Sequence, residues 1–273
     1  MATQPGINSV RWIRRAILAF VFLAPFLGFF LVRVNIFVAL APIFLSHLLL
    51  LYPTLVPNCQ WFGPVARSFE TSEPQVWLTI DDGPSPAHTM AMLDLLDRFH
   101  ARATFFVIGK NAEQHPQLVT EILARGHEIA NHTYTHPSAS FWMAGPIRIA
   151  AEIDRCAELL RSGPDRPPRF FRAPAGLKNV FVHPELERRR LALIGWTVRG
   201  LDTVLRDPAR VANRIVRGIK PGAIVLLHEG RRAEKDPEFN LRCLELTLSA
   251  LAENGYRCVI PQSEQLRSRA AGK

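Results

Sequence analysis

The sequence predicts an α/β protein in which about seven βα units form a barrel, preceded by an N-terminal transmembrane segment or a helical hairpin. From Glu73 onward, short β-rich apolar runs alternate with amphipathic helical patterns, as in repeated βα units around a parallel sheet. The stretch before it is different, because the apolar run after Arg15 is interrupted only by Arg33, Asn35, Ser46 and His47. With 273 residues, 48% of them hydrophobic, the chain can form one such domain and an appendage.

The N-terminal segment, residues 1–57, is predicted to anchor the chain in a membrane as an integral membrane protein. It contains two hydrophobic spans, residues 16–32 and 36–52, of about 17 residues each, which at about 1.5 Å per residue just cross the hydrocarbon layer. Basic residues before the first span favour a cytoplasmic N-terminus, namely Arg11, Arg14 and Arg15.

A cleavable signal peptide is the alternative for this segment, because residues 39–41 have the small-x-small pattern of a cleavage site. The apolar region is too long for a signal, however, and Pro42 would follow the cut directly, so we expect a retained anchor. A single crossing would leave the rest of the chain outside the cytoplasm. A hairpin folded at residues 33–35 would return it to the cytoplasmic face, and the sequence leaves both topologies open.

Seven strands are expected in the soluble domain, residues 74–263, which follows a linker at 58–73 and precedes a basic tail at 264–273. The first strand is an apolar run that ends at Asp-Asp-Gly-Pro, a sequence typical of turns. The expected strands are residues 76–80, 103–108, 127–131, 169–172, 192–198, 223–228 and 256–260.

Amphipathic patterns predict helices between these strands. In residues 88–99, Met90, Leu93 and Leu96 recur at three-residue steps and form one apolar face. Residues 115–126 end at a glycine, and residues 207–219 open with an Asp-Pro cap.

The charge and cysteine content restrict the partners and the compartment. Without residues 1–75 the chain keeps 28 basic and 22 acidic residues, and this balance of +6 suits a domain near anionic lipid or an acidic glycan. Nucleic acid is not expected as a partner, because there is no long Lys/Arg run, zinc knuckle or basic stretch with interleaved aromatic residues. The cysteines show no CxxC spacing and are expected to be buried free thiols, namely Cys59, Cys156, Cys243 and Cys258.

Chemically active side chains fall where the predicted strands end, and in a barrel these C-terminal ends form one face. In chain order they are Asp81, Asp82, His132, His136, Arg172, Asp202 and His228. Each has an ordinary structural explanation, because Asp-Asp-Gly-Pro makes a good turn and histidine pairs at four-residue spacing are common by chance. Their joint position on one face indicates a site.

The order of the motifs TIDDGP, HTYTH, FRAPAG, an aspartate after Gly-Trp, and LLHEG resembles the polysaccharide deacetylases of the NodB-homology class, carbohydrate esterase family four. The resemblance covers roughly residues 73–261. It implies a distorted (β/α) barrel of about seven strands, a divalent metal, and hydrolysis of an amide on an amino sugar. Such hydrolysis near neutral pH requires an activated water, an oxyanion stabiliser and an acid for the amine.

The resemblance also implies roles for individual residues. Asp82, His132 and His136 would bind the metal and leave positions open for water and substrate. Zinc is the first expectation, and cobalt, manganese or nickel suit the same ligands. Asp81 would act as the base that takes a proton from the activated water, because one carboxylate cannot perform both jobs.

The remaining roles follow from the other three motifs. Arg172 would hold Asp81 ionised and aimed, His228 would protonate the departing amine, and Asp202 would orient His228. The expected substrate-binding residues include a backbone N–H donor to the oxyanion and the wall of the acetyl pocket; the set is Pro174, Ala175, Leu226 and Trp196.

Three positions depart from the family pattern. Ala175 replaces a common tyrosine, Thr203 replaces a common tryptophan, and Arg199 stands where an acid is frequent. Two explanations remain open for the positive charge, namely contact with a phosphate or carboxylate on the substrate, or a solvated loop of mixed charge. The charged residues concerned are Arg199, Arg231, Arg232 and Lys235, with Glu234, Asp236 and Glu238.

Several functions are consistent with these observations. The first is a membrane-anchored, metal-dependent N-deacetylase of an amino sugar in a cell-envelope glycan. The alternative is a deformylase or deacetylase of a lipid-linked aminosugar at the cytoplasmic membrane face, and the least favoured is a non-catalytic glycan-binding barrel. The anchor also suits a subunit of an envelope-synthesis complex. The acyl group, sugar, native metal, membrane side and oligomeric state stay open.

Overall fold

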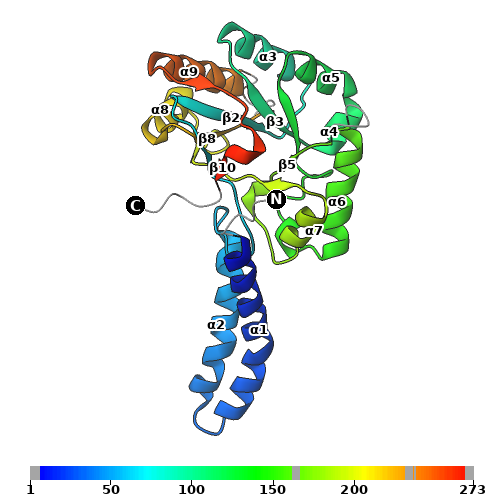
Figure 1. The fold of residues 1–273 in the computed structure, drawn as a ribbon, viewed down its shortest axis with the longest axis vertical. Helices are drawn as coiled ribbons and strands as arrows, with labels where there is room; N and C mark the ends of the chain where they lie inside the picture. Colours follow the sequence, from blue (N-terminus) through cyan, green and yellow to red (C-terminus); the bar gives the residue numbers. More distant parts are fainter. Residues whose placement is uncertain (1–6, 162–166, 231–235, 237, 268–273) are drawn as a thin grey trace.

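The computed structural model describes residues 7–161, 167–230, 236 and 238–267. An α/β domain carries a hairpin of two helices that projects from one end of it (Figure 1). Of the residues considered above for anion binding, Arg231, Arg232 and Lys235 lie outside the described part, as does Glu234.

The hairpin consists of α1 (Ile7–Leu31) and α2 (Ile36–Leu55), which lie side by side (Figure 1). Asn35 ends the connecting turn and caps α2, because its side chain accepts a 2.8 Å hydrogen bond from the backbone N–H of Phe37. By length and composition, Arg11–Leu31 and Ile36–Leu55 are each sufficient to cross a membrane.

The surface of the hairpin is strongly apolar. Five phenylalanine side chains on it are between 66% and 79% exposed, namely Phe22, Phe29, Phe30, Phe37 and Phe44. An apolar surface of this kind is normally covered by lipid or by a partner.

The domain is built on a curled, mainly parallel sheet with the order β10-β1-β8-β2-β3-β4-β5-β6, in which β7 also pairs with β8 and β9 with β2. The strands are β1 (Ser68–Phe69), β2 (Gln75–Asp81), β3 (Ala103–Val107), β4 (Glu128–Asn131), β5 (Phe170–Phe171), β6 (Ala192–Leu193), β7 (Val198–Arg199), β8 (Ala223–His228), β9 (Arg257–Cys258) and β10 (Leu266–Arg267). The sheet is therefore a half-barrel, the distorted barrel that the sequence predicts.

Alternation along β2 separates the two faces of the sheet. Val76, Leu78 and Ile80 pack on the outer face against the surrounding helices, whereas Trp77 packs on the inner face with Phe106, Phe170 and Ile224. Thr79 and Asp81 share the inner face with Trp77. The register pairs Asp81 with His228 of β8, so both polar side chains emerge together at the same end of the sheet.

Helices cover the outer face and one end of the sheet. Apolar side chains of α3, α5, α8 and α9 join the core formed with β2, β3 and β8, and those of α6 and α7 pack near β5 and β6. Asp207 caps α8 as predicted, accepting a 2.9 Å hydrogen bond from the N–H of Ala209. The helices are α3 (Thr89–Arg98), α4 (Gly109–Gln114), α5 (Pro116–Ala124), α6 (Pro146–Leu159), α7 (Val182–Arg188), α8 (Pro208–Gly218) and α9 (Phe239–Glu253).

The predicted strands are all present, but the one expected at 192–198 divides into β6 and β7 around residues 194–197. The folded part is also longer than predicted. The expected linker at 58–73 contributes β1, and the expected tail at 264–273 contributes β10, which pairs with β1 antiparallel. Strands of only two residues carry no alternating pattern, so sequence periodicity cannot reveal them. The four cysteines are buried and unpaired by disulfides, as expected.

Candidate active site

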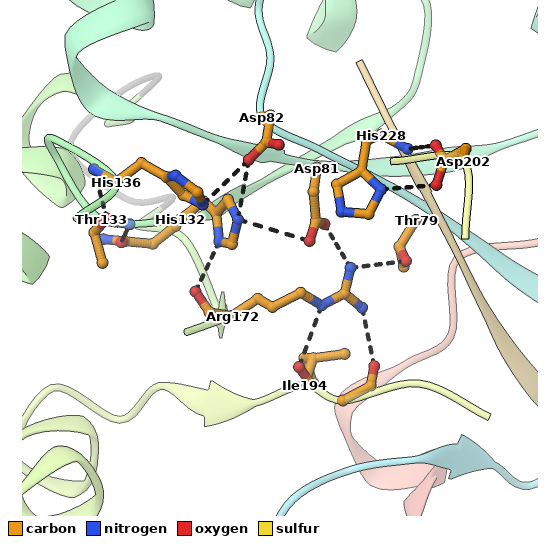
Figure 2. Close-up of polar contacts among 12 residues, drawn as sticks. Thr79, Asp81, Asp82, His132, Thr133, His136, Arg172, Ile194, Asp202 and His228 are labelled. Carbon is orange, nitrogen blue, oxygen red and sulfur yellow. Dashed lines mark hydrogen bonds and ion pairs between the residues drawn. The ribbon is translucent and has the colours of Figure 1, made fainter. Parts of the chain in front are cut away.

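Two consecutive aspartates leave β2 at the end where the inner face meets solvent. Asp81 is the last residue of the strand, and Asp82 follows with a positive φ of 77°. A positive φ is uncommon for a residue other than glycine, and it ends the extended path of the strand here. It lets Asp82 turn toward the histidines while Asp81 keeps the inner-face direction of the strand (Figure 2).

Asp82, His132 and His136 form a compact group of ligand atoms, all within 4.8 Å of one another. The Oδ1 of Asp82 lies 3.4 Å from Nε2 of His132 and 3.2 Å from Nε2 of His136. Nδ1 of His132 donates a 2.8 Å hydrogen bond to the backbone carbonyl of Arg172, so Nε2 presents its lone pair to the group. One carboxylate oxygen and two imidazole nitrogens fit a catalytic zinc site.

The loop after β4 holds the two histidines in place. Asn131 accepts a 2.9 Å hydrogen bond from the N–H of Thr133, and both Thr133 and His136 have positive φ angles. The carboxylate of Glu152, on α6, accepts hydrogen bonds from the backbone N–H and the hydroxyl of Thr135, at 2.8 and 2.6 Å. Glu152 was not predicted, because nothing in a surface-patterned helix indicates that one acid supports a distant loop.

The surroundings of Asp82 shift its pKa strongly. Burial opposes ionisation of Asp82, but its hydrogen bond with His132 and the charges of His132 and His136 hold its pKa well below its usual range. Asp82 is therefore ready to act as an anionic ligand throughout the neutral pH range.

Arg172 holds Asp81 from beneath the site (Figure 2). Its NH1 group donates to Oδ1 of Asp81 at 2.6 Å and to the hydroxyl of Thr79 at 2.9 Å. Its other nitrogens donate to the carbonyls of Ile194 and Gly195, at 3.3 and 2.9 Å. The guanidinium is fully buried, and burial lowers its pKa while Asp81 opposes that effect. The contacts fix the Asp81 carboxylate and leave its Oδ2 on the side of His132, 3.6 Å from Nε2.

Asp202 holds His228 on the opposite side of the site. One carboxylate oxygen accepts from the backbone N–H of His228 at 2.7 Å, and the other accepts from ring Nδ1 at 2.9 Å. Burial disfavours the charged imidazole, but the charge and hydrogen bond of Asp202, with smaller effects of Asp81 and Asp82, raise the pKa of His228. The Asp202 carboxylate therefore makes the His228 imidazole hold its proton more tightly than a free imidazole does.

These groups line one cleft of about 150 Å³. Arg172 and Asp202 act from behind its wall, and Pro174 is buried, so of the predicted substrate-binding residues Ala175, Trp196 and Leu226 reach the cleft. The lining also contains residues to which sequence reasoning assigned no role, Gly176 and Leu201. The complete lining is Asp81, Asp82, His132, His136, Ala175, Gly176, Trp196, Arg199, Leu201, Thr203, Leu226 and His228.

Glu229 is a further buried acid beside the site that sequence reasoning missed, although it belongs to the motif LLHEG. It accepts hydrogen bonds from the N–H of Ser85, at 2.9 Å, and from the hydroxyl of Thr89. Burial raises its pKa to about 7. Because Glu229 directly follows His228, these hydrogen bonds connect the end of β8 with the turn after Asp82.

Comparison with known proteins places the chain in a family. A family model described as polysaccharide deacetylase matches residues 69–191. A chitooligosaccharide deacetylase from a Bradyrhizobium strain is 39% identical over 190 residues, which make up 66% of this chain and 86% of the relative. The chain belongs to the polysaccharide deacetylase family. It is accordingly a hydrolase of carbon–nitrogen bonds other than peptide bonds.

Other members of the polysaccharide deacetylase family are similar over the same part of the chain. A peptidoglycan-N-acetylglucosamine deacetylase from Bacillus cereus is 33% identical over 207 residues, covering 75% of this chain and 94% of the relative. A family 4 carbohydrate esterase from Streptomyces lividans, solved in complex with acetate, superposes with a TM-score of 0.63 at 27% identity, covering 72% of this chain and 97% of that one. The family predicted from the motif order is confirmed.

Proposed function

We propose that the protein is a membrane-anchored, metal-dependent N-deacetylase that acts on an amino sugar in a cell-envelope glycan. The observation that carries this proposal is the arrangement of one cleft. The ligand group of Asp82, His132 and His136 has the Asp81–Arg172 pair on one side and His228 on the other. Relatives named for chitooligosaccharide and peptidoglycan deacetylation support the substrate class.

Asp82, His132 and His136 would hold the divalent cation, with zinc as the first expectation and cobalt, manganese or nickel suited to the same ligands. When bound, such a cation supplies a Lewis acid that polarises the amide carbonyl and acidifies a water molecule. The hydrogen bond from His132 to the Arg172 carbonyl keeps the first imidazole in the tautomer that this binding requires.

Asp81 would act as the general base. Its Oδ1 is occupied by Arg172, so Oδ2, on the side of the ligand group, takes the proton of the attacking water. The neighbouring guanidinium stabilises the ionised carboxylate, which must be free of a proton before the reaction starts.

His228 would act as the general acid. Its Nδ1 is held by Asp202, which leaves Nε2 to donate a proton to the departing amine as the carbon–nitrogen bond breaks. The backbone N–H of Ala175, in a left-handed residue with φ of 55° on the cleft wall, would donate to the developing oxyanion. Leu226 would contact the methyl of the acetyl group, and Trp196 would contact the sugar ring.

A second candidate function is deacylation of a lipid-linked aminosugar at the cytoplasmic membrane face. The observation that favours it is the hairpin, because two crossings return the chain to the side on which it began. Arg11, Arg14 and Arg15 precede the first span and favour the cytoplasm for that side. The hairpin equally suits docking onto an envelope-synthesis complex in the membrane.

Arg199 supports a substrate that carries negative charge. It lines the cleft, is exposed, and its guanidinium lies 5.8 Å from the centre of the Trp196 ring. A planar cation beside an aromatic ring suits a sugar that bears a carboxylate or phosphate.

The proposal is tested with the full-length protein in detergent micelles. Bound metal and acetate release from N-acetylated oligosaccharides are measured for wild type, Asp82→Ala and Asp81→Asn. Loss of metal only in Asp82→Ala, with release abolished in both variants, supports the division of roles. A wild type that binds no metal and releases no acyl group from peptidoglycan fragments or lipid-linked aminosugar would favour the non-catalytic glycan-binding barrel.

A further inference from the structure

We infer that the base of the hairpin, residues 54–58, supports the wall of the substrate cleft from behind. Asn58 and Lys178 are the positioning residues that hold Trp196 and the Pro174–Gly176 turn. The inference deepens the proposed function, on which it rests, by making substrate affinity depend on the membrane anchor. It follows from hydrogen bonds and close packing between two parts of the chain that are far apart in sequence.

The side chain of Asn58 makes two hydrogen bonds with the backbone of Trp196, one to its carbonyl and one from its N–H. Its Nδ2 donates to the Trp196 carbonyl at 2.9 Å, and its Oδ1 accepts from the Trp196 N–H at 3.4 Å. Trp196 lies between β6 and β7, where the predicted strand is interrupted. The Asn58 side chain thus takes the place that a neighbouring strand would occupy.

The approach of Asn58 to this stretch is very close. A Cβ added to Gly195 would overlap Oδ1 of Asn58, so the contact depends on glycine at that position. The carbonyl of Gly195 also accepts the hydrogen bond from NH2 of Arg172. The same short stretch therefore supports the partner of Asp81 on one side and the cleft wall at Trp196 on the other.

Lys178 joins the end of α2 to the turn that carries Ala175. Its Nζ donates to the carbonyls of Pro57 and Val56, at 2.6 and 3.2 Å, and its backbone N–H donates to the carbonyl of Thr54 at 3.4 Å. These carbonyls follow the last turn of a helix, where a cation is favourably placed. Lys178 is completely buried, and burial lowers its pKa to about 8.

The turn itself packs directly on the hairpin base. Gly176 has a positive φ of 73°, and an added Cβ would lie 2.7 Å from Cβ of Pro57 and 2.6 Å from the Trp196 ring. Gly176 and Trp196 both line the cleft. Pro57, Gly176 and Trp196 therefore form one packed layer, and a shift at the hairpin base would move the cleft wall.

A second polar contact between hairpin and domain offers a matched control. Arg11 of α1 and Glu187 of α7 form an ion pair at 3.2 Å, with both side chains substantially exposed. Neither residue lines the cleft. Removing this ion pair weakens a contact between the hairpin and the domain without changing the cleft wall. Exposed ion pairs of this kind contribute little to stability.

The test uses the full-length protein in detergent micelles loaded with zinc, as wild type, Asn58→Ala, Lys178→Met, Lys178→Arg and Arg11→Ala. Steady-state kinetics are measured on N-acetylglucosamine tetramer and on p-nitrophenyl acetate. The second substrate is a small ester that does not reach the cleft wall at Trp196. We expect KM for the tetramer to rise about tenfold in Asn58→Ala and Lys178→Met, the effect of one or two hydrogen bonds. In Asn58→Ala, kcat and the ester kinetics should stay near wild type, because Asn58 holds Trp196 and not the turn with Ala175. Lys178→Met should also lower kcat on both substrates, because Lys178 holds the turn that carries the Ala175 N–H. Lys178→Arg should recover affinity, and Arg11→Ala should match wild type.

A readout without catalysis separates this inference from the proposed function. The five tryptophans are labelled with 5-fluorotryptophan, and the Trp196 resonance is assigned by its loss in Trp196→Phe. We expect Asn58→Ala to shift this resonance and Arg11→Ala to leave it unchanged. If Asn58→Ala shifts the Trp196 resonance although the wild type releases no acetate, the positioning role is upheld and the deacetylase mechanism is rejected. The positioning role would be overturned if the Trp196 resonance stayed in place in Asn58→Ala. It would also be overturned if Asn58→Ala lost kcat equally on both substrates and lost thermal stability.

Discussion

Arg172 donates a 2.6 Å hydrogen bond to the carboxylate of Asp81, although it follows β5 and Asp81 ends β2, strands separated in the sheet by β3 and β4. Curling of the sheet brings the two strand ends together across its inner face. The long arginine side chain crosses that face above the ring of Phe106, at 4.1 Å from its centre. Asp81, the proposed base, and its partner Arg172 thus come from two strands that are not neighbours in the sheet.

Replacing Arg172 by methionine is expected to reduce kcat by at least about 10²-fold, because Asp81 loses the cation that orients and ionises it. The free energy of unfolding should fall by about 3–5 kcal/mol, since removal of one partner leaves a buried charge uncompensated. Arg172→Lys should recover part of the stability but less of the activity, because lysine lacks the planar fork. Acetate release and urea unfolding measure the two effects. Equal activity of the lysine and arginine forms would contradict the geometric role.

Asp202→Asn is expected to move the alkaline limb of the pH profile of kcat to lower pH by about one unit. Asp202 raises the pKa of His228, and the acid role requires the protonated form, so activity declines as pH rises through that pKa. Removing the carboxylate charge lowers the pKa, and the decline begins earlier. The acidic limb should stay in place. An unchanged alkaline limb would show that His228 is not the group that limits the rate there.

Zinc is expected to raise the thermal midpoint of wild type by several degrees at concentrations well above Kd, corresponding to about 2.7 kcal/mol at a hundredfold excess. Asp82→Ala should show no such rise, because it lacks one of three ligands. Differential scanning fluorimetry with and without a chelator gives the comparison without reference to activity. Asp81→Asn, with its ligand group intact, is the control and should keep the zinc response.

Acid should destabilise the fold partly through His127. Burial, with a smaller effect of Arg102, lowers its pKa to about 4, below the ordinary value of 6.5. Between these two values the unfolded chain binds a proton that the folded chain does not, so the free energy of unfolding falls as pH drops, by up to about 1.4 kcal/mol per pH unit. His127→Gln should reduce this slope from about pH 6.5 to 4 and leave the part that comes from His183, whose pKa burial lowers to about 3. Denaturant melts at several pH values test it, and an identical slope in the variant would refute it.

Arg199→Ala is expected to lower kcat/KM about five- to tenfold for oligosaccharides that carry carboxylate or phosphate, with little change for neutral ones. Arg199→Lys keeps the charge and should retain part of the preference. Paired assays on muramic-acid-containing fragments and on N-acetylglucosamine oligomers make the comparison. Equal losses on both classes would indicate that Arg199 contributes through Trp196 rather than through the substrate charge.

The sequence by itself determined the family, the parallel strands and the residues of the candidate site. Alternation and apolar runs set the strands, and the polar residues at their ends, from Asp81 to His228, converge because parallel strands expose their C-terminal ends on one side. The roles given to these residues stay predictions. Apolar length alone predicted an N-terminal transmembrane segment or a helical hairpin, and the structure has two apolar helices side by side.

Only the tertiary structure decided which distant groups support the site. Glu152 holds the histidine loop, Asn58 holds Trp196, and Lys178 caps the end of α2, and none of these residues lies in a recognisable motif. Strands β1 and β10 likewise depend on distant partners, because β1 pairs with β8 on one side and with the edge strand β10 on the other. Periodicity reports how each segment is buried, whereas such contacts depend on where the folded chain brings two segments together.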